Sequence, residues 1–321
     1  MRIKGLFYGV SKSVAHELAG IFDYTWPTVV AFKELRQRLH PEDRKGVADL
    51  IRSVGEVRCN AANFGSLLSS TEEEVEAQIA KRLLYDQCAL LEGWLEELVS
   101  LVAPPGKKDG WKRERLKDLQ FPGSVRVAVK NLAQPESGFV KNNLHDQLTG
   151  HKHYLGGTEV IHTLPGGAAA DRLQSLLWCY RAFKELRNAF IHNGGRSSSK
   201  FHDAATNWQQ LRMAIKPHDL AMKRLPKVPV VAVGDPLTID LYEVVGFGGI
   251  VTRLLRTLDA DLAVAKSAEK EISRRWTLAY GAGVALGRSR SAVGMLRVIG
   301  FPAAKHAGDL VVFLKAEGLG T

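Results

Sequence analysis

Apolar side chains recur along this chain at intervals of three and four residues, which is the spacing of an amphipathic helix. The longest such run follows Ser70–Glu74, where a hydroxyl residue that can cap a helix precedes three acids that complement the positive end of the helix dipole. We expect this helix to end near Val102, because Pro104-Pro105-Gly106 cannot continue it. Its apolar positions cover more than one narrow stripe, which indicates a central helix packed by several neighbours.

A second long helix is predicted over Ala168–His192, and the Asn193-Gly194-Gly195 that follows it is typical of a glycine cap at a helix C-terminus. Two further helices are expected, from Lys200 to about Ile215 and from Asp240 onward. Strands do not alternate with helices in the way that a parallel sheet requires. The pattern therefore predicts an all-α fold.

These patterns divide the chain into an N-terminal helical region (1–70), a helical domain (71–268) and a small basic C-terminal helical appendage (269–321). Pro27 and Pro41 are expected to interrupt the helices of the first region. A long insertion at about 104–167 separates the two long helices of the central domain, and we expect its part from 134 to 167 to be an irregular loop.

Composition indicates an ordinary globular protein, with 321 residues of which 45% are hydrophobic. No apolar run reaches the roughly 18 residues that a membrane span needs, and the N-terminus lacks the features of a signal peptide, so we expect a cytoplasmic protein. Cys59, Cys88 and Cys179 lie among apolar neighbours and are expected to be buried thiols.

The formal net charge of +10 is concentrated in two segments. Residues 104–130 hold eight basic and three acidic side chains, and residues 272–321 hold seven and two, so that each contributes +5. Basic surfaces of this kind favour a polyanionic partner, because phosphate contacts release counterions. Solubility alone would explain the charge equally well.

Within the first basic segment an aromatic ring lies among cations, as in proteins that bind single-stranded nucleic acid by stacking and phosphate pairing. The residues that we expect to contact RNA are Lys107, Lys108, Trp111, Lys112 and Arg113, together with Arg196 beside the second long helix. A surface helix anchored by one tryptophan would have the same pattern.

Four histidines, His145, His151, His153 and His162, fall in or beside the expected loop. They lack nearby cysteines, and Asp146, beside His145, is the carboxylate nearest to any of them in the sequence. Histidines in a basic loop are more often solvent-facing than metal-bound, so we predict neither a metal site nor a cofactor.

The end of the second long helix carries the candidate chemistry. Arg187 and His192 are five residues apart, a rise of about 7.5 Å and a rotation of roughly 140° on an ideal helix. A guanidinium can hold a phosphate and neutralise charge in a transition state, and an imidazole can give or take a proton. Spacing alone is weak evidence, because Arg196 and His202 are nearly as close in the sequence.

The complete string Arg187-Asn188-x-x-x-His192, placed at a glycine-capped helix end, resembles the hallmark of the HEPN superfamily (higher eukaryotes and prokaryotes nucleotide-binding). The segment Leu90–Leu98, in which Glu92 is followed by a glycine and a tryptophan, is similar to the first helix of its prokaryotic ribonuclease branches. The resemblance extends over roughly residues 72–265.

This resemblance implies a HEPN-like helical bundle in which Arg187 and His192 are the catalytic pair, Asn188 supports them, and Glu92 orients or charge-balances Arg187. It implies a homodimer with two motifs facing each other across one cleft, and metal-independent RNA cleavage by 2′-hydroxyl attack. A toxin or antiphage defence effector, restrained by an antitoxin or another partner protein, would have this activity.

Two other interpretations stay open at this point. One is a non-catalytic HEPN scaffold or RNA-binding adaptor that acts with a partner protein. The other is an all-helical interaction protein in which Arg187 pairs with a carboxylate and His192 only caps the helix.

Overall fold

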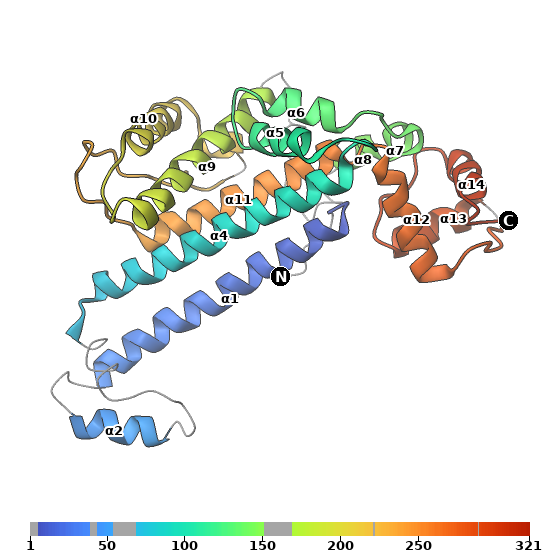
Figure 1. The fold of residues 1–321 in the computed structure, drawn as a ribbon. Helices are drawn as coiled ribbons and strands as arrows, with labels where there is room; N and C mark the ends of the chain where they lie inside the picture. Colours follow the sequence, from blue (N-terminus) through green and yellow to red (C-terminus); the bar gives the residue numbers. More distant parts are fainter. Residues whose placement is uncertain (1–5, 39–43, 54–68, 151–168, 221, 288) are drawn as a thin grey trace.

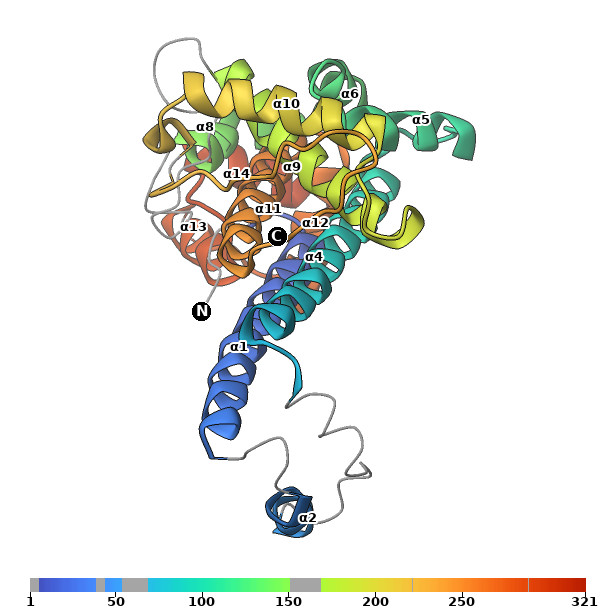
Figure 2. The ribbon, with the colours of Figure 1, turned by 90° about the vertical axis from the view of Figure 1, so that its left-hand side faces the viewer.

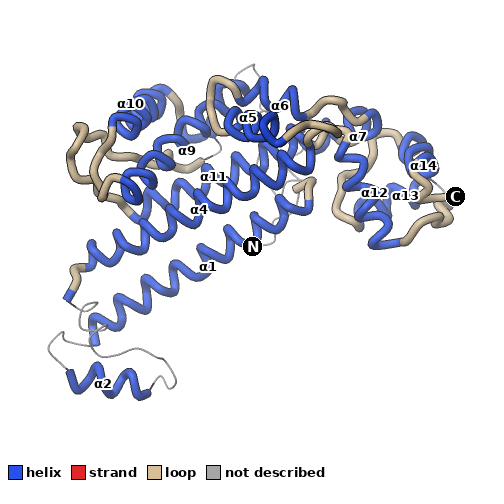
Figure 3. Tube along the Cα trace, in the orientation of Figure 1, coloured by secondary structure: helices blue, strands red, loops and turns tan. Residues whose placement is uncertain are grey.

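The computed structural model describes residues 6–38, 44–53, 69–150, 169–220, 222–287 and 289–321. These residues form helices and connecting loops, without a strand among them (Figure 3), which confirms the predicted all-α class. In chain order the helices are α1 (Gly9–Arg38), α2 (Arg44–Ser53), α4 (Glu72–Val102), α5 (Asp109–Leu119), α6 (Val125–Leu132), α7 (Gly138–Asn143), α8 (His145–Gly150), α9 (Ala169–His192), α10 (Ser199–Ala214), a 3₁₀ turn (Pro217–Leu220), α11 (Leu241–Leu262), α12 (Ser267–Tyr280), α13 (Ser289–Val298) and α14 (Ala307–Ala316).

The centre of the fold is α4, which contacts α1, α11, α9 and α5. α1 and α4 run side by side over most of their length, with α11 alongside them (Figure 1). α9 packs against α4 and α11, and α10 covers its other side. The C-terminal half of α1 and the N-terminal half of α4, called the far halves of these helices below, project from the bundle toward α2, whereas α12–α14 lie at the opposite end (Figures 1 and 2).

Local sequence accounts for the start of α4. The Thr71 hydroxyl accepts a hydrogen bond from the Glu74 amide at 3.1 Å, and the Glu74 carboxylate accepts one from the Thr71 amide at 2.8 Å. This reciprocal capping satisfies two backbone donors that the first turn of a helix leaves open. The predicted helix start and the predicted end near Val102 are both confirmed.

One hydrophobic cluster extends from the first described residues to the C-terminus. It includes Phe7 and Tyr8 before α1, Trp94 in α4, Phe247 in α11, and Leu314 in α14. All three predicted segments therefore contribute side chains to a single core, and the domain boundaries themselves stay a prediction.

Two expectations about local structure are wrong. α1 continues through Pro27, whose exposed ring faces solvent and leaves the buried side of the helix packed against α4. The expected loop from residue 134 contains α7 and α8, which have six residues each and pack against distant helices, while the Ser137 hydroxyl caps the start of α7. Pro41 and the remainder of that loop, 151–167, lie outside the described residues.

Candidate functional site at the end of helix α9

The chain turns away sharply after α9. The amides of Asn193 and Gly195 both donate to the Ala189 carbonyl, at 3.0 and 3.1 Å. Gly194 and Gly195 have φ values of +60° and +75°, which L residues with side chains rarely adopt. The glycine cap predicted from the sequence is therefore confirmed, and it leaves His192 as the last helical residue.

Arg187 is half-buried and is held by neighbours on its own helix. Its Nη1 donates to the Asn188 side-chain oxygen at 3.0 Å, and the Asn188 amide nitrogen lies 3.4 Å from a carboxylate oxygen of Glu185. The Nε of Arg187 is buried without a hydrogen-bond partner. Asn188 thus links the arginine to the buried Glu185 carboxylate, as a supporting residue would.

The guanidinium acts electrostatically on α4. Burial raises the pKa of the Cys88 thiol to about 12, Glu92 adds to the rise, and the charge of Arg187 opposes it. Burial likewise raises the pKa of Tyr85, and Arg187 again opposes the rise. Arg187 therefore lies toward the face of α9 that packs on α4.

His192 is exposed, as are its neighbours Ile191 and Asn193. Because α9 stays helical through His192, the imidazole and Arg187 remain about 140° apart around the helix axis. A single α9 therefore presents the arginine toward α4 and the histidine toward solvent, and does not close a site around one phosphate.

Glu92 of α4 forms its ion pair with Lys184, whose ammonium lies 2.6 Å from a carboxylate oxygen. The Tyr180 hydroxyl donates to the same oxygen at 3.2 Å, and Lys184 also donates to Gln120 at 2.7 Å. The carboxylate expected to balance Arg187 is thus engaged one helical turn earlier on α9. Sequence reasoning missed Lys184 and Tyr180, although both lie on the same face of α9 as Arg187, three and seven residues before it.

The expected RNA-binding residues are dispersed. Trp111 is half-buried against the core, with the Lys107 ammonium 5.2 Å and the Arg115 guanidinium 5.8 Å from its ring centre. Lys112 lies 3.9 Å from Asp109, whereas Lys108 and Arg113 are exposed. These contacts agree with an anchoring role for Trp111 as well as with a cationic surface around it.

Arg196 lies beyond the cap, and its Nη1 donates to the Gly234 carbonyl at 3.0 Å. Gln120, at the C-terminal end of α5, accepts from Lys184 on α9, whereas residues 107–113 lie at or just before the N-terminal end of α5, about 10 Å or more away along the helix axis. The structure therefore places Arg196 near the motif and residues 107–113 away from it.

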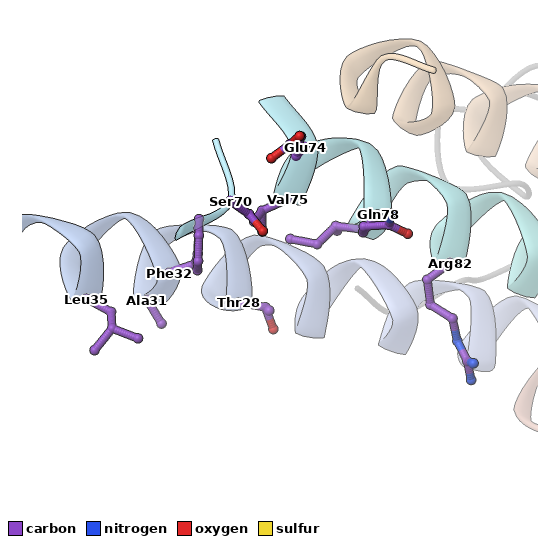
Figure 4. Close-up of a pocket in the computed structure, with 10 residues that line it drawn as sticks. Thr28, Ala31, Phe32, Leu35, Ser70, Glu74, Val75, Gln78 and Arg82 are labelled. Atoms are coloured by element: carbon purple, nitrogen blue, oxygen red, sulfur yellow. The ribbon is translucent and has the colours of Figure 1, made fainter. Parts of the chain in front are cut away.

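A cavity of about 960 Å³ lies between the far halves of α1 and α4 (Figure 4). Thr28, Phe32, Val75 and Arg82 are among its lining residues, and the predicted catalytic residues are not. This cavity and the motif are separate features of the fold.

The cysteines and histidines outside the motif were also assigned roles from the sequence. Cys88 and Cys179 are buried free thiols, as expected, and Cys59 lies outside the described residues. No cluster of three or more histidine, cysteine or acidic side chains that could hold a metal occurs in the described part of the chain. Burial lowers the pKa of His145, and the other three histidines of the insertion lie outside the described residues.

No described helix combines the length and apolar character that crossing a bilayer demands. Comparison with protein-family models, with curated proteins and with solved structures finds no match to this chain.

Proposed function

We propose that this protein is a metal-independent endoribonuclease of HEPN type that acts as a homodimer in toxin–antitoxin or antiphage defence. The observation that carries the proposal is the arrangement at the end of α9. Arg187 is held by Asn188, and His192 is exposed at a helix end that two glycines terminate. The string is the one that resembles the HEPN hallmark.

In the proposed reaction the ribose 2′-oxygen attacks the adjacent phosphorus and the bond to the 5′-oxygen breaks, leaving a 2′,3′-cyclic phosphate. The guanidinium of Arg187 binds the phosphate and stabilises its developing negative charge. The 2′-hydroxyl loses a proton and the departing 5′-oxygen gains one; His192 carries out one of these transfers, and solvent water carries out the other. Because the nucleophile belongs to the RNA, the reaction as proposed uses no metal-bound water.

A second copy of the chain supplies the missing half of the site. Within one α9 the two side chains lie on different sides of the helix, so one copy holds the phosphate poorly between them. His192 and the 44% exposed Ile191 are available at the helix end to meet another molecule. In the proposed dimer, Arg187 of one protomer and His192 of the other contact the same phosphodiester.

The test is cleavage of single-stranded RNA by the purified full-length protein in the presence of EDTA. We expect Arg187→Ala and His192→Ala each to lower the rate about 100-fold or more, in the range of lost acid–base or charge stabilisation. His218→Ala is the matched control, because this imidazole is 76% exposed in the 3₁₀ turn and is expected to leave cleavage unchanged.

The products discriminate the mechanism. Cyclic phosphate ends are expected, and a substrate with a 2′-deoxy sugar at the cleaved position should resist. Cleavage that survives both substitutions would show that Arg187 and His192 are not the catalytic residues. Loss of cleavage with EDTA would contradict the metal-independent mechanism.

A non-catalytic RNA-binding adaptor is the second candidate function. The exposed Lys108 and Arg113 on either side of Trp111 favour it, because they form a cationic surface away from the motif. It predicts RNA affinity that falls steeply with salt, no cleavage, and no effect of His192→Ala on binding.

A further inference from the structure

A second cavity, of about 340 Å³, lies between α1 and α11. Its lining comes from one face of each helix, including Ala19, Phe22 and Trp26 of α1 and Gly248, Gly249 and Arg256 of α11. None of these residues belongs to the motif at the end of α9. Its volume falls within the range of small-molecule binding sites.

Two consecutive glycines line this cavity. At Gly248 a Cβ atom would lie 2.2 Å from the Phe22 ring, so α1 approaches α11 closely only because this residue has no side chain. At Gly249 a Cβ atom would meet Met222 at 3.2 Å and the Arg253 guanidinium at 3.3 Å. The Phe22 ring therefore occupies the place that a side chain at Gly248 would take, and the cavity is a groove beside this contact.

The walls of the groove are mainly apolar. Leu18, Phe22 and Leu255 contribute hydrocarbon surface. Among the described residues of the lining, Thr252 carries the hydroxyl group, which donates to the Gly248 carbonyl at 2.9 Å. An apolar ligand body can therefore occupy the groove without displacing a hydrogen bond of this hydroxyl.

A buried guanidinium marks one part of this apolar wall. Arg256 lines the groove and is only 5% exposed, and burial lowers its pKa. Arg253 lies one turn earlier and donates to the carbonyls of Leu220 and Gly249. Burial, with the charge of Arg256, lowers the pKa of Arg253 to about 10, so two cations lie close together here.

Asp23 is the carboxylate in the lining, and it is exposed. Water screens the charge of an exposed group much more than that of a buried one. The electrostatic character of the groove therefore changes from a screened carboxylate at the surface to a desolvated cation inside.

We infer that this groove binds a small monoanion with an apolar body, the anionic group at Arg256 and the body between α1 and α11. A charge-assisted hydrogen bond to a desolvated guanidinium stabilises such a ligand, and the apolar walls bury its hydrocarbon part. Trp26, which is 38% exposed, lines the same groove and reports on occupancy. This site is independent of the proposed ribonuclease activity.

The test compares two fluorescent probes that share an aromatic body. The anion is 1-anilinonaphthalene-8-sulfonate, and the neutral control is N-phenyl-1-naphthylamine. On the wild-type protein we expect one sulfonate per chain, with quenching of tryptophan fluorescence, and affinity at least about tenfold above that of the neutral probe.

Three variants separate charge from space. Arg256→Gln should weaken the sulfonate about tenfold or more while changing the neutral probe by less than about threefold. Ala19→Trp, which fills the groove from α1, should weaken both probes. Arg297→Gln removes an exposed charge on α13 and is expected to change neither.

The inference is overturned if the wild-type protein binds neither probe or binds both equally well. Equal sulfonate affinity in the wild type and Arg256→Gln would also overturn it, as would full binding by Ala19→Trp. If circular dichroism shows that Arg256→Gln does not fold, the wild-type affinity ratio and Ala19→Trp decide the outcome.

Discussion

The buried carboxylate of Asp259 in α11 accepts hydrogen bonds from residues just before α1. The amides of Phe7 and Tyr8 donate to the two oxygens of Asp259, at 2.5 and 3.1 Å. Ser11 also hydrogen-bonds Asp259, and its hydroxyl oxygen accepts from the Trp94 indole at 2.9 Å. One side chain therefore connects α11 with the start of α1 and, through Ser11, with α4.

We expect Asp259→Ala to destabilise the protein strongly at low pH. Phe7 and Tyr8 are both fully buried, so the substitution leaves two amide donors without acceptors. Each buried unsatisfied donor costs about 1–3 kcal/mol, which gives about 2–6 kcal/mol for the pair. A typical domain is stable by only about 5–15 kcal/mol.

The difference in unfolding free energy between the wild type and Asp259→Ala should become smaller as the pH rises. Burial raises the pKa of Asp259 from 3.8 to about 6, despite the hydrogen bonds that oppose the shift. The folded protein therefore holds a proton that the unfolded chain has lost, and this contribution declines between about pH 4 and pH 6. The shift corresponds to about 3 kcal/mol, so the gap between wild type and Asp259→Ala should narrow by up to that amount from pH 4 to pH 7.

Urea unfolding followed by circular dichroism at both pH values measures the gap. Asp203→Ala is the control, because this exposed carboxylate on α10 should change stability by less than about 0.5 kcal/mol. A gap that widens with pH would refute the desolvation argument. An Asp259→Ala protein as stable as the wild type at pH 4 would refute the hydrogen-bond argument.

Three further predictions concern the fold. Thr71→Ala removes half of the reciprocal cap with Glu74 and should cost about 1 kcal/mol in urea unfolding, whereas Thr71→Ser should cost little. Gly248→Ala places a Cβ atom against the Phe22 ring and should cost about 1–3 kcal/mol in the same assay; addition of Phe22→Ala, which removes the ring, should abolish that clash. Burial raises the pKa of the Glu269 carboxyl, but its hydrogen bonds and the Lys266 cation outweigh burial, and the net pKa is lowered. The stabilising contribution of this carboxylate is therefore lost as the pH falls below about 4. The urea unfolding curves of the wild type and Glu269→Gln should converge in that pH range.

The helices that can be predicted from the sequence are those with strong local signals. Residues 70–74 contain every group of the cap at the start of α4, and Gly194-Gly195 contains the backbone freedom that ends α9. These elements need no distant partner to be recognised, because capping and glycine conformations depend on neighbouring residues.

The two six-residue helices α7 and α8 were not predicted in this way. α7 has six residues, and the carboxylate of Glu269 in α12 accepts from the Ser137 hydroxyl and the Phe139 amide at its start. A helix this short is unstable alone, so its existence depends on a residue 130 positions away in the chain. Pro27 shows the converse, because the packing of α1 on α4 maintains a helix that local propensity disfavours.

The candidate site also combines local features, which can be predicted from the sequence, with tertiary contacts, which cannot. Local pattern is enough to place an arginine, an asparagine and a histidine in the last two turns of a glycine-terminated helix, because helical periodicity and capping depend on neighbouring residues. The packing of the helices sets the pairing of Glu92 with Lys184, the orientation of Arg187 toward α4 and the exposure of His192 to solvent. Ion pairs and burial depend on which helices pack together, and helical spacing along one segment does not contain that information.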